Sequence, residues 1–540
     1  MAIHIYVLLS GGTALRNQNL SAGSVSTERL FIGPLLHRFF KNGLILTLSA
    51  LAMRIVGVSF NSFITSKVGA DGIGLYTLIM SVYGFSVTVA SSGVHLASTR
   101  LCAEARDRAH LFAALRRCLI WAGSCGLAVA VGLAVGADFI SIKLLQDARC
   151  AASLRLLGMS MPFIALSNVL SGYFTAVRKV SRNAAAQIFE QLFKIFVSVY
   201  LLLYILPDGI EYACIALVGG GMLAEAASFI VSLILFLIDS RVMGRTGRAV
   251  DCIDRAIPAN GRVTPEEGRE LTRELFGIIL PVSAAAYIRS ALNTAEHILI
   301  PMRLRANPAT SANALAALGV LGGMVMPVIM LPTALLYSFT GLLVPEFAEA
   351  NSRGDNARIR RITERATHMT LVFSIGCAGV MYLLSDELGI LLYDNADAGR
   401  LIRVMSALIP VMYLDHAVDA ILKGLGEQLY SMKVNILDAA MSVILVYFLC
   451  GRLGVWGYVL TIYISELVNA SLSMVKLWKR VDFRPRLRSW LICPLFCAAA
   501  AVLSAGLMPA GVGWAALLLR GTVVVGVYVT LTLIFWGGRR

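Results

Sequence analysis

Apolar stretches of about 20 residues alternate with short polar segments along almost the whole chain. A helix needs about 20 apolar residues to cross the roughly 30 Å hydrocarbon core of a bilayer. A sliding window of about 19 residues therefore predicts fourteen membrane-spanning helices and an all-α integral membrane fold. The predicted ranges are 43–65, 74–99, 112–136, 153–177, 184–206, 211–238, 275–301, 315–343, 366–385, 401–422, 432–451, 455–475, 490–508 and 514–537.

The composition agrees with a membrane protein. The 540 residues are 58% hydrophobic and 15% charged, and the mean hydropathy is +0.76. Soluble proteins are far more polar, so these values argue against a soluble enzyme, a disordered scaffold or a nucleic-acid binder. The sequence has no GxxxxGK[ST] phosphate loop and no HExxH zinc motif, so we predict neither an enzyme nor a cofactor. Its ten cysteines include no CxxC pair and are expected to be small buried hydrophobic residues.

The basic residues lie mainly in alternate loops. The formal charge is +15, from 47 Lys and Arg against 32 Asp and Glu. If the N-terminus is cytoplasmic, most of these basic residues fall on the cytoplasmic side, as the positive-inside rule requires. Both termini are therefore predicted to be cytoplasmic. The basic surplus is a topology signal, with contact to membrane lipids as a secondary effect and no nucleic-acid partner.

Several features recur in the same order in the two halves of the chain. They are Arg54 with Asn61 and Arg289 with Asn293, the segments Cys102-Ala103-Glu104-Ala105 and Phe347-Ala348-Glu349-Ala350, and the acidic pairs Glu190 with Glu225 and Asp438 with Glu466. Because each half has six helices, the repeats should face the same way in the membrane and form two lobes. The predicted divisions are a cytoplasmic tail (1–42), an N-lobe (43–238), a basic cytoplasmic linker (239–272), a C-lobe (273–478) and a segment with helices 13 and 14 (479–540).

Charged groups inside the predicted spans cost a few kcal/mol each and usually mark functional sites. Arg54 and Arg289 are the basic candidates, because a guanidinium group binds phosphate oxygens through a planar fork of donors. An ion pair between the lobes is the structural alternative. The predicted substrate-binding residues are Arg54, Asn61, Arg289, Asn293 and Glu296.

Carboxylates within the spans are candidates for ion coupling. Asp415 and Asp419 lie one helical turn apart with His416 beside them, and their mutual repulsion favours binding of a proton or sodium ion. The alternative is that both are hydrated at a helix end. Glu190 is a third coupling candidate, although Lys194, four residues later, could neutralise it. No metal site is predicted.

Two blocks of sequence resemble a known family. The first, from Leu46 to Leu101, contains Arg54-Ile55-Val56-Gly57, Val68-Gly69-Ala70-Asp71-Gly72-Ile73-Gly74-Leu75-Tyr76 and Ala90-Ser91-Ser92-Gly93. The second contains Ile298 to Leu304, Gly319 to Gly323, Pro327, Leu331-Pro332-Thr333 and Leu343-Val344-Pro345. Both blocks resemble the stage V sporulation protein B and polysaccharide biosynthesis family of the multidrug/oligosaccharidyl-lipid/polysaccharide flippase superfamily. The chain departs from related flippases at Phe60-Asn61, where peptidoglycan-lipid flippases have Arg-Asp, and at Glu296, where the sporulation subgroup usually has Asp.

The resemblance implies two six-helix lobes arranged in a V around a central cavity. It also implies a flippase that moves an undecaprenyl-pyrophosphate-linked oligosaccharide, a peptidoglycan or polysaccharide precursor, to the outer leaflet of the bacterial cytoplasmic membrane during cell-wall or spore-cortex synthesis. Its expected partners are this lipid-linked saccharide, membrane lipids, H⁺ or Na⁺, and wall-synthesis enzymes. Two alternatives are a cation-coupled multidrug antiporter of the same fold and a non-transporting membrane scaffold for wall synthesis.

Overall fold

The structure is a computed structural model that describes residues 25–105, 108–177, 179–205, 209–246, 264–307, 313–483, 487–507 and 513–537. Every regular element in these ranges is a helix, which confirms the predicted all-α class. Among these described residues, ten helices are long and apolar enough to cross a membrane, and one bent pair forms an eleventh candidate span. The described ranges do not include residues 1–24 of the predicted tail. They also do not include residues 247–263 of the predicted linker, among which is Cys252.

The chain forms two compact units. Unit 1 comprises Met1–Phe63, Met324–Asp438 and Ile462–Arg540, and unit 2 comprises Ile64–Gly323 and Ala439–Thr461. This division differs from the predicted lobes, because the beginning of the first long helix groups with the second half of the chain. The first helix of the predicted C-lobe likewise groups with the first half.

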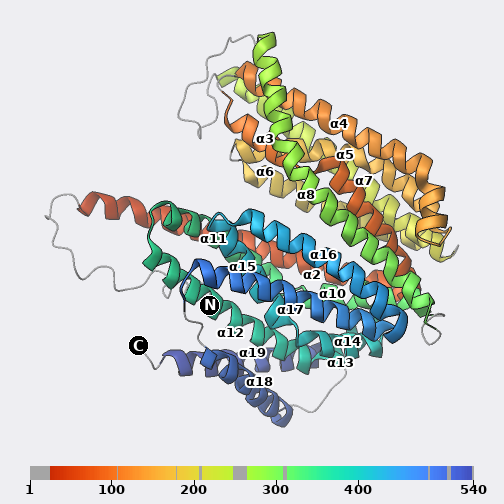
Figure 1. Ribbon diagram of the computed structural model, residues 1–540, viewed down its shortest axis with the longest axis vertical. Coiled ribbons are helices and arrows are strands. Elements are labelled where there is room, and N and C mark those ends of the chain that lie inside the picture. The colour runs from red at the N-terminus through yellow and green to blue at the C-terminus, as the bar shows by residue number, and fades with distance from the viewer. Residues whose placement is uncertain are drawn as a thin grey trace. The chain divides into compact units, whose positions relative to one another are not determined.

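Unit 2 contains the helices of the first half of the chain. They are the later part of α2 (Val25–Ser91), α3 (Val94–Ala103), α4 (Arg108–Phe139), the π-helix η1 (Ile140–Leu144), α5 (Cys150–Ala176), α6 (Val180–Ile205), α7 (Ile210–Thr246), α8 (Pro265–Arg305) and α9 (Ala314–Leu318). Figure 1 shows α4, α5 and α7 running alongside one another. Small residues permit this close packing, since Gly126 of α4 lies against Pro162 of α5 and Gly220 of α7 against Ser198 of α6.

Three side chains on one face of α8 attach this helix to the chain around the end of α2. Ser283 Oγ donates to the Ser92 carbonyl at 3.0 Å, and Tyr287 OH donates to the Val89 carbonyl at 3.2 Å. Further along, Thr294 Oγ1 donates to the carbonyl of Ser81 at 3.1 Å. These contacts explain why α8 belongs to the same compact unit as the helices that precede it.

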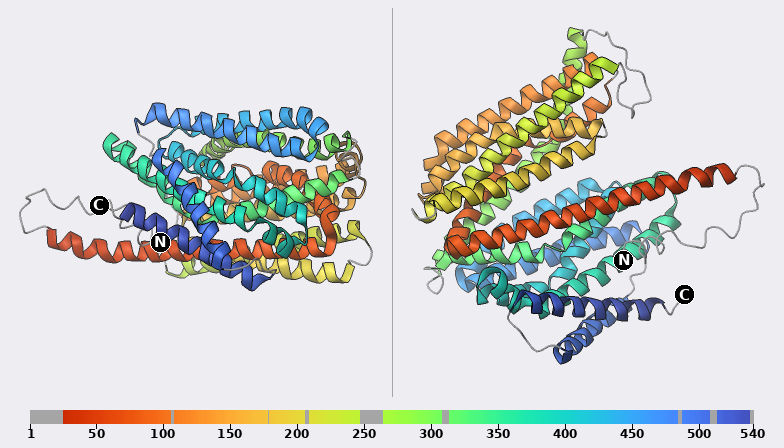
Figure 2. Two further views of the ribbon diagram at one scale, coloured as in Figure 1. Left: turned by 90° about the horizontal axis from the view of Figure 1, so that it is seen from below. Right: turned by 180° about the vertical axis from the view of Figure 1, so that it is seen from behind.

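Unit 1 contains most of the second half of the chain. Its helices are the beginning of α2, α10 (Met326–Ile329), α11 (Thr333–Ser352), α12 (Asn356–Leu383), α13 (Ser385–Tyr393), α14 (Ala396–Ser406), α15 (Ile409–Gly424), α18 (Leu487–Leu507) and α19 (Trp514–Gly537), with parts of α16 (Gln428–Leu453) and α17 (Val455–Arg480). A buried core that includes Phe347, Ala366, Ile421 and Leu477 joins α11, α12, α15 and α17. The last two helices, outside the predicted repeat, run side by side (Figure 2) and pack against α12.

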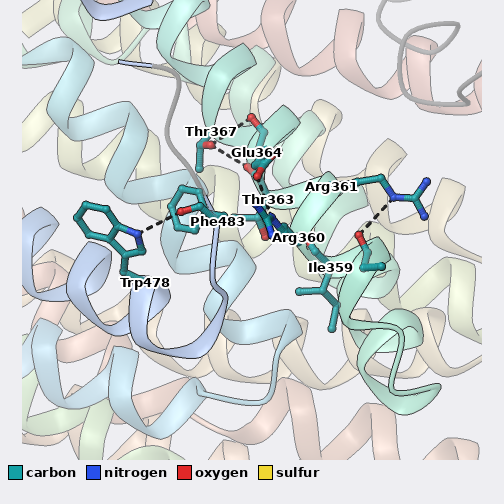
Figure 3. Close-up of polar contacts among 9 residues, drawn as sticks. Ile359, Arg360, Arg361, Thr363, Glu364, Thr367, Trp478 and Phe483 are labelled. Atoms are coloured by element: carbon teal, nitrogen blue, oxygen red, sulfur yellow. Dashed lines mark hydrogen bonds and ion pairs between the residues drawn. The ribbon is translucent and has the colours of Figure 1, made fainter. Parts of the chain in front are cut away.

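Two buried threonines of α12 are satisfied locally. Figure 3 shows Thr363 and Thr367, whose hydroxyls donate to backbone carbonyls one turn earlier at 2.9 and 2.7 Å. Nearby, the indole Nε1 of Trp478 donates to the Phe483 carbonyl at 3.1 Å, which ties the end of α17 to the segment that follows it. Such internal bonds let hydroxyl side chains lie in an apolar core without unpaired donors.

The course of four predicted segments differs from expectation. The first two predicted helices join in α2, which bends at Gly69 (φ 75°, ψ 178°) and begins at Val25, inside the predicted tail. The predicted helix 315–343 is divided into α9, the π-helix η4 (Gly319–Val325), α10 and α11. The predicted helix 401–422 is divided into α14 and α15, which meet at 55°. Pro332 and Pro410 begin new helices at these breaks because proline lacks the N–H that a continuous helix requires.

Candidate substrate and ion sites

Arg54 lies on an exposed face of α2 in unit 1. Its Nη2 is 3.4 Å from the Met330 carbonyl, at the break between α10 and α11. No salt bridge to Arg54 is found among the described residues. A single long bond to a neutral carbonyl leaves most of the guanidinium donors available, so this residue can still bind an anion.

Arg289 lies on α8 in unit 2 and is also exposed. Within the described part of the chain it has neither a hydrogen bond nor an ion pair. Asn293, four residues later, is exposed on the same side of α8. Arg289 and Asn293 could therefore contact the same ligand.

Glu296 and Asn61 are held by neighbouring side chains. Ser442 Oγ of α16 donates to Glu296 Oε1 at 2.6 Å, within unit 2. Asn61 lies beside the Tyr393 hydroxyl at the end of α13, in unit 1. Burial raises the pKa of Tyr393 to about 12, while the neighbouring Asn61 acts in the opposite direction. Both predicted residues therefore have structural partners within their own unit.

Unit 1 brings four carboxylates together on α15, α16 and α17. Asp415 is buried and accepts a 3.0 Å bond from Asn469 Nδ2, and Glu466 lies near both Asp415 and Asp438. Asp419 differs, because it forms an ion pair with Lys423 at 2.6 Å. The predicted pair of Asp415 and Asp419 is thus divided into a buried carboxylate bonded to an asparagine and one that forms an ion pair with a lysine.

His416 points away from this acidic group. Its Nε2 lies 3.2 Å from the Tyr337 hydroxyl of α11, and the two rings stack with centroids 5.5 Å apart. Adjacent residues on a helix face different directions, which separates His416 from Asp415 although they are neighbours in the sequence.

Unit 2 contains a second acidic group on α6 and α7. Glu190, Glu225 and Lys194 lie close enough to interact electrostatically. Tyr83 of α2 donates its hydroxyl to Glu225 Oε1 at 3.2 Å. Lys194 therefore acts on both carboxylates, not on Glu190 alone as the four-residue spacing predicted. Acidic pairs on consecutive helices come together in each unit, as Glu190 with Glu225 and Asp438 with Glu466.

Sequence reasoning missed the polar residues that complete these groups. Asn469, Tyr83 and Tyr337 contact Asp415, Glu225 and His416, respectively. A buried asparagine in an apolar span is a detectable signal, and Asn469 could have been selected on that basis. A single tyrosine in a membrane helix is common, so Tyr83 and Tyr337 carried no such signal.

Comparison with known families accounts for this architecture. The sequence model of the family described as "Polysaccharide biosynthesis protein" matches residues 39–351, more than half of the chain. The chain belongs to the polysaccharide biosynthesis protein family. A second match, to the MatE family, covers residues 302–448, so both halves carry signatures of the multidrug/oligosaccharidyl-lipid/polysaccharide superfamily. This membership confirms the resemblance to the stage V sporulation protein B group.

Relatives of this family member come from Bacillus subtilis (strain 168). Stage V sporulation protein B is 25% identical over 429 residues, covering 78% of this chain and 80% of the relative. Sporulation protein YkvU is 19% identical over 366 residues, covering 67% of this chain and 77% of the relative.

Solved structures show the same fold. The lipid II flippase MurJ in an inward closed conformation has a TM-score of 0.68 at 12% identity, covering 92% of this chain and 99% of that one. An inward-facing multidrug resistance MATE transporter has a TM-score of 0.64 at 14% identity, covering 81% and 98%. The chain therefore has the fold of these transporters, and its long apolar helices identify a multi-pass membrane protein.

Proposed function

We propose that the protein moves an undecaprenyl-pyrophosphate-linked oligosaccharide from the cytoplasmic to the outer leaflet of the bacterial cytoplasmic membrane by alternating access, with both termini cytoplasmic. The observation that carries this proposal is the state of Arg289, which is exposed on a membrane-spanning helix without a partner among the described residues. A charge in that position is costly unless it meets water or an anion. A pyrophosphate group supplies such an anion.

Arg54 supports the same substrate class. Its guanidinium contacts only a backbone carbonyl among the bonds found, so it keeps donors for phosphate oxygens. An arginine on a spanning helix suits a negatively charged phosphate better than a cationic drug. The names of a sporulation relative and of a lipid II flippase with the same fold agree with a lipid-linked wall precursor.

Ion coupling is proposed to depend on the carboxylates of unit 1. Asp415 is buried beside Glu466 and Asp438 on neighbouring helices, whereas Lys423 neutralises Asp419. A proton or sodium ion would relieve the repulsion within the group. We therefore assign coupling to Asp415 and Glu466 ahead of Asp419, with Glu190 and Glu225 as a second group in unit 2.

A cation-coupled multidrug antiporter is the second candidate function. The two acidic groups favour it, because a cationic drug needs carboxylates in its path. The antiporter differs from the flippase in the role of the arginines, because Arg54 and Arg289 cannot bind a cationic drug through charge attraction.

The decisive experiment measures translocation of a fluorescent undecaprenyl-pyrophosphate-linked saccharide in vesicles that contain the purified protein. We expect Arg54→Ala and Arg289→Ala each to lose most of the activity at normal protein levels. Arg400→Ala is the matched control, because this arginine is 76% exposed and pairs with an exposed Asp397. Unchanged translocation in both variants would exclude the proposed substrate, and drug export that survives in both would favour the antiporter.

A further inference from the structure

Tyr337 and His416 form an aromatic pair in unit 1 whose outer side is open. Their ring planes are inclined by only 29° and the hydroxyl and Nε2 are 3.2 Å apart, so stacking and a hydrogen bond fix the same geometry. Tyr337 is nevertheless 55% exposed. The pair therefore presents the exposed ring of Tyr337, which the half-buried His416 holds in a fixed orientation.

The aromatic pair lies close to Arg54. Tyr413, one turn before His416 on α15, donates its hydroxyl to the Ile329 carbonyl at 2.8 Å. Arg54 contacts the next carbonyl along the chain, that of Met330. Arg54 and Tyr337 also both lie within electrostatic range of the Tyr413 hydroxyl. The break between α10 and α11 thus places a guanidinium group and a stacked aromatic pair in one region.

The chemistry of this region differs from that of a lipid-facing surface. A tyrosine at a bilayer interface exposes an apolar ring and directs its hydroxyl to water. Here the hydroxyl is used to hold an imidazole, and a charged arginine lies nearby on a membrane-spanning helix. Groups of this polarity within a span usually face a cavity or a ligand.

A sugar pyrophosphate matches the two parts of the region. The phosphates carry negative charge, which suits the planar donors of arginine. The adjoining sugar ring has an apolar C–H face, which matches the exposed aromatic face of Tyr337. A lipid pyrophosphate without a sugar would contact the arginine but not the aromatic pair.

We propose that the Tyr337–His416 pair binds the first sugar of the lipid-linked saccharide while Arg54 binds the pyrophosphate. This inference rests on the proposed function, and it adds a residue pair that distinguishes a sugar-bearing lipid from the bare carrier. Tyr337 supplies the ring face, and His416 holds that ring in place.

Binding to the purified full-length protein in nanodiscs tests this division of roles. The probes are undecaprenyl pyrophosphate and undecaprenyl-pyrophosphoryl-N-acetylhexosamine. We expect Arg54→Ala to weaken both probes by about tenfold or more, as loss of a charge-assisted contact should. Tyr337→Ala and His416→Ala should weaken only the sugar-bearing probe, by roughly three- to tenfold, and leave the bare pyrophosphate unchanged.

Two further variants keep the test independent of folding. Tyr337→Phe retains the ring and removes the bond to His416, so it should weaken sugar binding less than Tyr337→Ala. Tyr200→Ala is the control, since Tyr200 is a 65% exposed tyrosine on α6 in unit 2 and should leave both probes unaffected. Equal loss of both probes in Tyr337→Ala, or no loss of either, would overturn the inference while leaving the flippase proposal intact. Failure of the wild-type protein to bind either probe would instead contradict the proposed function.

Discussion

Arg520 of α19 forms an ion pair with Glu387 of α13, and the two side chains are only 14% and 19% exposed. The short helix α13 makes further polar contacts within unit 1. Arg403 of α14 pairs with Asp386, and Ser62 of α2 donates to the Leu392 carbonyl. Helix α13 therefore collects contacts from the C-terminal helices and from the first long helix.

Removing one partner of this ion pair should destabilise unit 1. We expect Arg520→Ala to lower the free energy of unfolding by about 3 kcal/mol, because Glu387 would remain as a largely buried unpaired charge. Thermal unfolding in detergent measures the effect. Arg520→Ala/Glu387→Ala should be less destabilised than the sum of the single variants, and an additive result would show that the pair contributes no coupling energy.

The approach of α2 to α9 in unit 2 depends on glycine. A Cβ on Gly74 would overlap the Leu315 carbonyl, and one on Gly319 would overlap the carbonyl of Ala70. Backbone atoms cannot rotate away, so we expect Gly74→Ala to cost about 1–3 kcal/mol and to lower the melting temperature. Gly84→Ala, in the same helix with nothing within 4 Å of the added Cβ, is the control and should be neutral or slightly stabilising. Equal melting temperatures for the two variants would contradict this packing.

Gly69 should be intolerant of substitution for a different reason. Its added Cβ would meet nothing within 4 Å, but its φ of 75° with ψ near 180° is a conformation that only glycine adopts readily. We expect Gly69→Ala to cost about 1–3 kcal/mol or to straighten α2. Gly57→Ala, in an open helical position of α2, should not do so. A spin-label distance across the bend distinguishes the two variants, and an unchanged distance with unchanged stability would contradict the requirement for glycine.

Asp147 should make stability dependent on pH. This residue lies between the candidate spans and is buried, which alone would raise its pKa, but hydrogen bonds and charge from Arg149 lower the pKa below its usual 3.8. A lowered folded-state pKa gives stability that is present above about pH 4 and is lost as the pH falls through the folded-state pKa. The melting temperature of Asp147→Asn should lie below that of the wild type at about pH 7, and the gap should close in acid. Asp397→Asn, at a 74% exposed position, is the control and should have the melting temperature of the wild type at neutral and at acidic pH. If the difference in melting temperature between Asp147→Asn and the wild type did not change with pH, the carboxylate charge would not be its cause.

Hydropathy was sufficient to predict the class of fold, because the cost of unpaired backbone groups in lipid leaves few alternatives to a helix. Each predicted range has a helical counterpart among the described residues. The breaks at 407–408 and 330–332 were not predicted, since Pro332 and Pro410 lie inside apolar runs that a window average treats as continuous. The bend at Gly69 depends on a backbone dihedral that no hydropathy value reports.

The candidate sites could be predicted only in part. Charge inside an apolar run identified Arg54, Arg289 and Asp415 because such charge is rare there. Their partners depend on which helices pack together, and a helix-by-helix reading does not contain that information. Asp419 illustrates this. The residues four positions before and after it on the same helix are Asp415 and Lys423, and repulsion from Asp415 was the expected interaction. In the structure Asp419 forms an ion pair with Lys423.

The helix α2 belongs to both compact units, with its residues up to Phe63 in one and those from Ile64 in the other. A sharp kink in a long helix has a local cause, and in α2 that cause is a residue without a Cβ, five residues beyond Ile64. The regular helical geometry is interrupted there, so α2 consists of two helical segments with different axis directions.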